Sequence, residues 1–138
     1  YPLLPITLIN HPGWDHHNNL PSEYKTRITE LSSKIYSFWK ALEKKQKYVT
    51  IIITTEFGRS VKENFSLGCD HGAASVMMVL SHKIEGGQIY GNWPGLDENQ
   101  LMNGGLKVTS DSRQVLNEII YTIYSKNNNV NKLTKLFI

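Results

Sequence analysis

Two short clusters of aspartate and histidine are the residues of this 138-residue sequence best suited to chemistry. The first is Gly13-Trp14-Asp15-His16-His17 and the second is Gly68-Cys69-Asp70-His71-Gly72. Each places a carboxylate beside an imidazole in a turn that contains glycine, and these two ligand types together suit divalent ions such as zinc or manganese. The clusters therefore predict a metal site, provided that the fold brings them together.

A further carboxylate and a guanidinium follow an apolar, β-branched run at residues 49–55. Glu56 comes directly after this run and is a candidate ligand, although it could instead cap a loop amide. Arg59 could pair with a surface acid or hold an anion through two parallel hydrogen bonds.

The remaining polar residues of the clusters have structural alternatives. His11 precedes Pro12 and is typical of a turn, with metal binding as the second interpretation. His16 and His17 are adjacent, so we do not expect both to point into one site. Asp70 could close an Asx-turn. Cys69 is interpreted as a bystander, and as the single cysteine it excludes an internal disulfide.

The first half of the sequence predicts a βαβ unit with a right-handed crossover. Residues 3–9 form its first strand, near a sheet edge because of Pro5. A helix follows from Ser22, its expected cap, to about Lys44. Residues 49–55 form a second strand that is covered on both faces. The apolar face of the helix recurs every three or four residues: Ile28, Leu31, Ile35, Phe38 and Leu42.

The second half predicts a long loop at residues 57–74 and a strand at 75–80 that runs antiparallel to its neighbour. A short strand at 88–90 and a helix from Ser110 or Asp111 to Asn127 complete the pattern. The apolar side of this helix is Val115, Leu116, Ile119, Ile120 and Ile123.

This topology explains how the clusters could meet. In open α/β sheets, ligands bind beyond the carboxyl ends of the parallel strands. Asp15 and His17 follow the first strand at that end, and Glu56 follows the second. An antiparallel strand at 75–80 begins at the same end and would deliver Asp70 and His71.

Length and charge favour one domain over residues 1–138, and the formal net charge is +3. The basic run at residues 44–47 falls where the helix should end, which favours a dipole interaction over nucleic-acid binding. No apolar run approaches about 18 residues, so no membrane span is predicted. The sequence begins with Tyr1 rather than Met, so the absence of a targeting signal carries no conclusion, and both a fragment and a full gene product stay open.

From about Pro12 to Leu116 the ordered motifs resemble the C-terminal half of the DUF1501 family, a sulfatase-like bacterial family that looks like a branch of the alkaline phosphatase superfamily. The motifs that carry the resemblance are Gly13-Trp14-Asp15-x-His17, Thr55-Glu56-Phe57-Gly58-Arg59, Gly68-x-Asp70-His71-Gly72, Gly86-Gly87-x-x-Tyr90-Gly91-x-Trp93-Pro94-Gly95-Leu96 and Val108-Thr109-x-Asp111-x-Arg113-x-Val115-Leu116.

The resemblance implies a three-layer α/β/α fold with a mixed sheet, part of an alkaline-phosphatase-like domain. It also implies a metal-dependent phosphatase or sulfatase type of site that acts on an anionic ester, in an exported bacterial protein. Asp15 and His17 match one metal-binding pair, His71 matches a further metal-site histidine, and Glu56 matches a carboxylate ligand. Zinc is the first expectation, with manganese, magnesium or calcium as alternatives. Asp70, Arg59, His11 and His16 are secondary candidates.

Three departures from the family pattern bear on activity. His16 stands where threonine is usual, and Ala73 and Ala74 stand where histidine and glycine are frequent. The N-terminal half, which would supply another ligand and the nucleophile, is missing from the sequence. We therefore expect a catalytically incomplete domain, which the missing half or an oligomer partner could complete. The alternative is a non-catalytic module that binds a metal or an anion or serves in assembly. A small α/β domain whose polar turns are only structural is the third interpretation.

Overall fold

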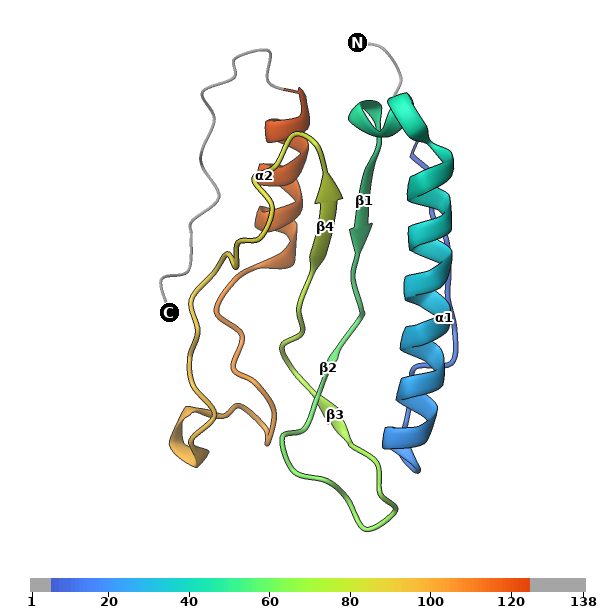
Figure 1. Ribbon diagram of the computed structural model, residues 1–138. Helices are drawn as coiled ribbons and strands as arrows, with labels where there is room; N and C mark the ends of the chain where they lie inside the picture. The colour runs from blue at the N-terminus through green and yellow to red at the C-terminus, as the bar shows by residue number, and fades with distance from the viewer. Residues whose placement is uncertain (1–5, 125–138) are drawn as a thin grey trace.

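The computed structural model describes residues 6–124, and β1 and β4 lie between the two long helices (Figure 1). The elements in chain order are α1 (Leu20–Ala41), the 3-10 helix η1 (Glu43–Tyr48), β1 (Thr50–Ile53), β2 (Gly58–Arg59), β3 (His71–Gly72), β4 (Met78–Ser81), the 3-10 helix η2 (Glu98–Gln100) and α2 (Ser112–Tyr124). Helices and small antiparallel sheets combine, so the chain has the expected mixed α/β class.

The strands of the described residues form two separate two-stranded sheets, β1–β4 and β2–β3. β1 pairs with β4 in antiparallel register, from Thr50 opposite Ser81 to Ile53 opposite Met78. The antiparallel direction predicted for the strand after the long loop is therefore confirmed, although the strand begins three residues later than expected. The hydroxyl groups of Thr50 and Ser81 lie 2.8 Å apart and add a cross-strand hydrogen bond.

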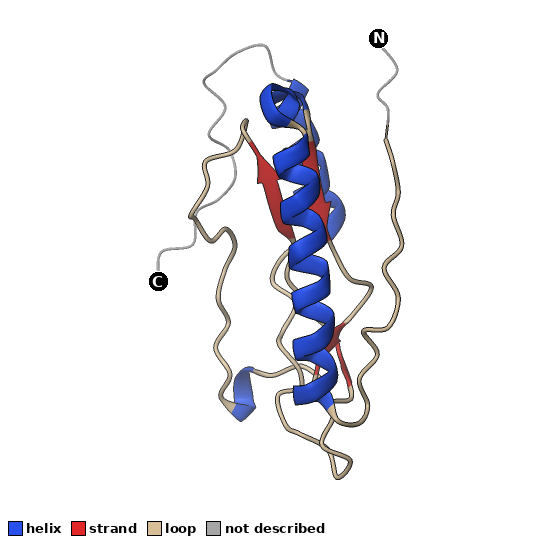
Figure 2. Cartoon of the chain, turned by 45° about the vertical axis from the view of Figure 1, so that its right-hand side comes forward, coloured by secondary structure: helices blue, strands red, loops and turns tan. Residues whose placement is uncertain are grey.

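The strand predicted at residues 3–9 is not formed in the part that is described. Residues 3–5 lie outside the described residues, while Ile6, Leu8 and Ile9 are 82%, 95% and 82% exposed in an unpaired segment. Figure 2 shows this segment running along the chain's outer side without a strand beside it. The predicted βαβ unit is therefore absent from residues 6–124, because an apolar sequence becomes a strand only where another strand can share its hydrogen bonds.

Helix α1 begins two residues before the predicted start. Asn19 is its N-cap, with φ 46° and no side-chain cap, and Pro21 occupies the first turn, so the prediction that Ser22 caps the helix is wrong. The amides of Asn19 and Leu20 instead donate to the carbonyl oxygens of Ser66 and Leu67, at 3.1 and 2.8 Å. A distant loop therefore anchors the start of α1.

The apolar stripe of α1 is only half-buried. Ile28, Leu31, Ile35 and Leu42 are partly covered, whereas Phe38 is 51% exposed, which corrects the expectation that it packs with them. Figure 1 shows α1 beside β1, with the helix axis running along the strand. No residue of α1 is fully buried.

Helix α2 begins at Ser112, and the Asp111 carboxylate accepts a hydrogen bond of 2.9 Å from the Arg113 amide as a helix N-cap. Ile119 is buried, while Ile120 is 45% exposed and does not join the predicted apolar side. The predicted end near Asn127 lies outside the described residues. Residues 88–90 do not form the predicted strand, since only Tyr90 makes an isolated bridge.

The apolar core is small. Among residues 6–124, Ile119 is the one buried hydrophobic side chain. None of the described helices is long and apolar enough to cross a membrane.

Candidate metal centre

The short β2–β3 pair places Arg59 and His71 opposite each other. In its antiparallel register Gly58 faces Gly72 and Arg59 faces His71. The sequence predicted an unstructured loop here, but both strands lie within it. A side chain at Gly58 would collide with the Ala74 carbonyl oxygen, so the close approach of these segments requires glycine at this position.

The first cluster docks on the loop that precedes the second. The Cys69 amide donates to the His16 carbonyl oxygen at 3.1 Å, and the Asn64 side-chain amide donates to the His17 carbonyl oxygen at 3.0 Å. A Cβ atom on Gly68 would collide with the backbone of His17. Gly68 is therefore a point where the backbones of the two clusters come into close contact.

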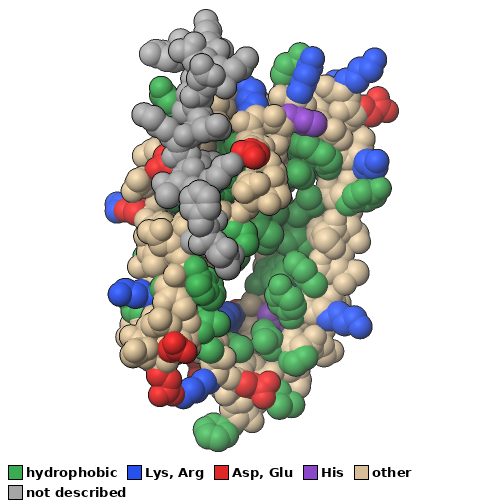
Figure 3. All heavy atoms as spheres, turned by 60° about the vertical axis from the view of Figure 1, so that its left-hand side comes forward, with side chains coloured by type: hydrophobic (Ala, Val, Ile, Leu, Met, Phe, Trp, Pro, Cys, Tyr) green, Lys and Arg blue, Asp and Glu red, His purple; other side chains and the backbone are tan. Residues whose placement is uncertain are grey.

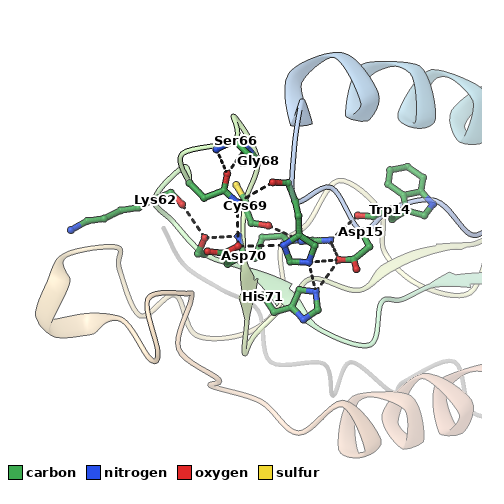
Figure 4. Close-up of polar contacts among 12 residues, drawn as sticks. Trp14, Asp15, Lys62, Ser66, Gly68, Cys69, Asp70 and His71 are labelled. Atoms are coloured by element: carbon green, nitrogen blue, oxygen red, sulfur yellow. Dashed lines mark hydrogen bonds and ion pairs between the residues drawn. The ribbon is translucent and has the colours of Figure 1, made fainter.

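Three ligand-type atoms converge where the clusters meet (Figure 4). Asp15 Oδ1 lies 2.8 Å from His71 Nε2 and 3.2 Å from His17 Nε2. The two Nε2 atoms are 3.0 Å apart. Ligand atoms bound tetrahedrally to zinc at about 2.0–2.1 Å are about 3.3–3.4 Å from one another, so small side-chain movements would seat an ion.

The three side chains of the cluster are each about half exposed to solvent. The exposed fractions of the Asp15, His17 and His71 side chains are 58%, 44% and 49%. A set of two imidazole nitrogens and one carboxylate oxygen with an open position is a donor set that catalytic zinc sites use. The residues present therefore fit a divalent ion chemically as well as geometrically.

Asp70 lies behind His17 rather than in the three-atom cluster. Its Oδ1 is 3.3 Å from His17 Nδ1 and accepts a hydrogen bond of 3.1 Å from the Asn64 side chain. Metal-bound histidines commonly use their second ring nitrogen in this way, which fixes the ring orientation. Asn64 also accepts hydrogen bonds from the Ser66 and Gly68 amides, so its own side chain is fixed by the loop.

Both carboxylates favour their charged forms. The hydrogen bond from His71 is the largest cause that lowers the pKa of Asp15, and Arg59 and His17 lower it further. The pKa of Asp70 is lowered first by the hydrogen bond from Asn64 and then by His17. With neutral imidazoles, two carboxylates and one guanidinium give the site a net charge of −1, which favours a cation.

The other candidates lie apart from the three-atom group. Glu56 is exposed in a bend and is not a member of it. His11 Nδ1 accepts a hydrogen bond of 2.9 Å from the Trp14 indole, which agrees with the turn interpretation. His16 is buried at 7% exposure, its Nε2 has no hydrogen-bond partner, and it is not a member of the three-atom group.

Asn64 and Phe57 also contact the site, and neither was predicted from the sequence as a site residue. The Phe57 ring stacks on the His71 imidazole, with centroids 3.9 Å apart and an interplanar angle of 23°. Phe57 directly precedes Gly58 and Arg59 in the sequence, and this position could have indicated that it lies near the site. Asn64 had a weaker signal, its place four residues before Gly68 in a predicted loop.

The fold and the site together define a mixed α/β chain that carries a solvent-accessible Asp-His-His cluster able to accommodate a divalent cation. Residues 4–116 match the family described as Protein of unknown function (DUF1501), and the chain belongs to that family. No significant match was found among curated proteins or among solved structures.

Proposed function

We propose that this chain is the metal-binding part of a metal-dependent hydrolase that acts on phosphoric or sulfuric esters. The observation that carries the proposal is the convergence of Asp15 Oδ1, His17 Nε2 and His71 Nε2 within 2.8–3.2 Å of one another. The resemblance of the motifs to a sulfatase-like family supports an ester as the substrate, and the partial exposure of the three side chains would let it reach the cluster.

In this proposal each residue has a defined part. Asp15, His17 and His71 would hold the ion, and Asp70 would orient the His17 ring through Nδ1. A bound divalent ion would supply charge neutralisation at the ester oxygens and activation of a nucleophile. The exposed side of the cluster would admit the anionic group, while the stacked Phe57 would restrict the orientation of His71.

We further propose that β1 and β4 belong to a three-layer α/β/α arrangement. The positions of α1 and α2 on either side of this sheet support that assignment (Figures 1 and 2). The resemblance assigns the nucleophile and a further ligand to an N-terminal half, so the chain by itself should hydrolyse esters poorly. Zinc is the first candidate for the ion, because two imidazoles and one carboxylate form a typical zinc donor set.

Calorimetric titration with Zn²⁺ and Mn²⁺ tests the metal site directly. Replacing His17 by Ala removes one of three ligands and should weaken zinc binding by more than about 100-fold, beyond the loss typical of an outer-shell partner. His82→Ala is the matched control, because His82 contacts Gln46 and Trp39 rather than the cluster. Equal zinc affinities for the unmodified chain and His17→Ala would refute the site.

Hydrolysis of aryl phosphate and aryl sulfate esters tests the second half of the proposal. We expect the zinc-loaded chain to show no turnover above that of free zinc, because the proposed nucleophile lies elsewhere. Rapid turnover that His17→Ala abolishes would show that the site is complete in this chain. Zinc binding without ester hydrolysis in the whole gene product would instead support the non-catalytic alternative.

A further inference from the structure

The Arg59 guanidinium is directed inward. Its side chain is 23% exposed, and three hydrogen bonds engage it. Nη1 donates to the Cys69 carbonyl oxygen at 2.8 Å. Nη2 donates to the Trp14 carbonyl oxygen at 2.9 Å and to Asp15 Oδ1 at 2.6 Å. The acceptors belong to the two clusters, which are far apart in the sequence.

The same residue is also connected to His71 in two ways. Its backbone lies opposite His71 in the β2–β3 register. Its guanidinium carbon lies 5.4 Å from the centroid of the Phe57 ring, and that ring stacks on His71. Arg59 therefore connects the strand that carries His71 to the turn that carries Asp15, and the shared atom Asp15 Oδ1 faces both histidines.

We propose that Arg59 is a positioning residue of the metal centre, which holds Asp15 in register with His17 and His71, rather than a residue that binds the anionic substrate. This inference rests on the proposed function, because an effect of Arg59 on zinc affinity requires the proposed metal site. The planar guanidinium suits the role, because its fixed N–H directions reach the Trp14, Asp15 and Cys69 acceptors at once. A lysine ammonium at the end of a flexible chain would retain the charge but lose this geometry.

The charge of Arg59 and its hydrogen-bond geometry have opposite effects on metal affinity. A guanidinium within hydrogen-bond distance of Asp15 repels a bound cation, so removal of the charge alone would tighten metal binding. Removal of the positioning would weaken it. Arg59→Lys isolates the geometric effect because it keeps the charge, whereas Arg59→Ala removes both.

Zinc titration of these two variants tests the inference. We expect Arg59→Lys to weaken zinc binding about 10–100-fold, the range typical of residues that orient metal ligands, and Arg59→Ala also to weaken it. The matched control is Arg113→Lys, because Arg113 pairs with Asp111 and its side chain is 86% exposed. Unchanged affinity in Arg59→Lys with tighter binding in Arg59→Ala would overturn the inference. Titration with inorganic phosphate is the second measurement. If Arg59→Lys kept its zinc affinity but lost phosphate binding, Arg59 would bind the anion and the inference would also be overturned.

Hydrogen exchange in the metal-free chain separates this inference from the proposed function. The Cys69 amide, bonded to the His16 carbonyl oxygen at 3.1 Å, reports the contact between the two clusters. We expect it to exchange about tenfold faster in Arg59→Lys, with the β1–β4 amides unchanged. If the unmodified chain binds no zinc, the proposed function fails, and unchanged Cys69 exchange would independently refute the positioning role. Should Arg59→Ala fail to fold, the lysine variant carries both tests.

Discussion

Asp15 Oδ1 is the most connected atom of the candidate site. It lies within 2.6 Å of Arg59 Nη2, 2.8 Å of His71 Nε2 and 3.2 Å of His17 Nε2. The first two contacts are hydrogen bonds that lower the pKa of its carboxyl group. The charged carboxylate is consequently available as a ligand well below neutral pH, so proton competition for the metal falls on the imidazoles.

At the residue scale we predict that zinc affinity decreases as the pH is lowered from about 8 to about 5.5, because imidazole binds a metal only when it is deprotonated. The lowered pKa values of Asp15 and Asp70 keep both carboxylates charged through this range. Calorimetry at several pH values should therefore show protons released on binding at the acidic end. An affinity that does not change over this range would exclude histidine ligands.

At the scale of elements, a close backbone contact at Gly68 adds to the hydrogen bonds that join the two clusters. Gly68 touches the backbone at His17, and the neighbouring amides of Asn19 and Leu20 bond to the loop carbonyls of Ser66 and Leu67. The start of α1, the first cluster and the loop before β3 therefore form one assembly. Its geometry depends on the absence of a side chain at residue 68.

We predict that Gly68→Ala lowers both the thermal unfolding midpoint and the zinc affinity, because its methyl group would push the His17 backbone away from the loop. Gly86→Ala is the matched control, since a Cβ atom there meets nothing within 4 Å. Differential scanning calorimetry and zinc titration of both variants measure the effect. The contact would be unimportant if the two alanine variants behaved alike.

At the scale of the whole molecule, much apolar surface is exposed. Ile119 is the one buried hydrophobic residue within 6–124, whereas residues such as Phe38, Phe65 and Val76 are 51%, 110% and 66% exposed. Figure 3 shows hydrophobic side chains gathered in the middle of one face. Burial of apolar surface is the main stabilising contribution in folding. Because few apolar side chains are buried among the described residues, this contribution is small for the chain by itself.

We predict that the isolated 138-residue chain binds the dye ANS strongly and unfolds with low cooperativity, as expected of a protein with exposed apolar surface and little fixed packing. Dye fluorescence and thermal unfolding by circular dichroism measure these properties. Zinc should leave most of the dye binding intact, because Asp15, His17 and His71 are not among the exposed hydrophobic residues. A sharp transition without dye binding would contradict this prediction.

The sequence by itself determined the features that depend on local pattern. The period of three to four residues predicted α1 and most of its half-buried stripe, and the β-branched run predicted β1. The motifs predicted membership of the family that residues 4–116 match. Helical periodicity and β propensity act between near neighbours in the chain, so they can be read without knowledge of the fold.

Only the tertiary structure decided which polar residues meet. It brought Asp15, His17 and His71 together, left Glu56 outside the group, placed Asp70 behind His17, and turned Arg59 inward. It also left residues 6–9 unpaired, which removed the topology from which the meeting of the clusters was predicted. Long-range contacts depend on strand pairing and close backbone approach, here at Gly58 and Gly68, and neither has a local signature that specifies its partner.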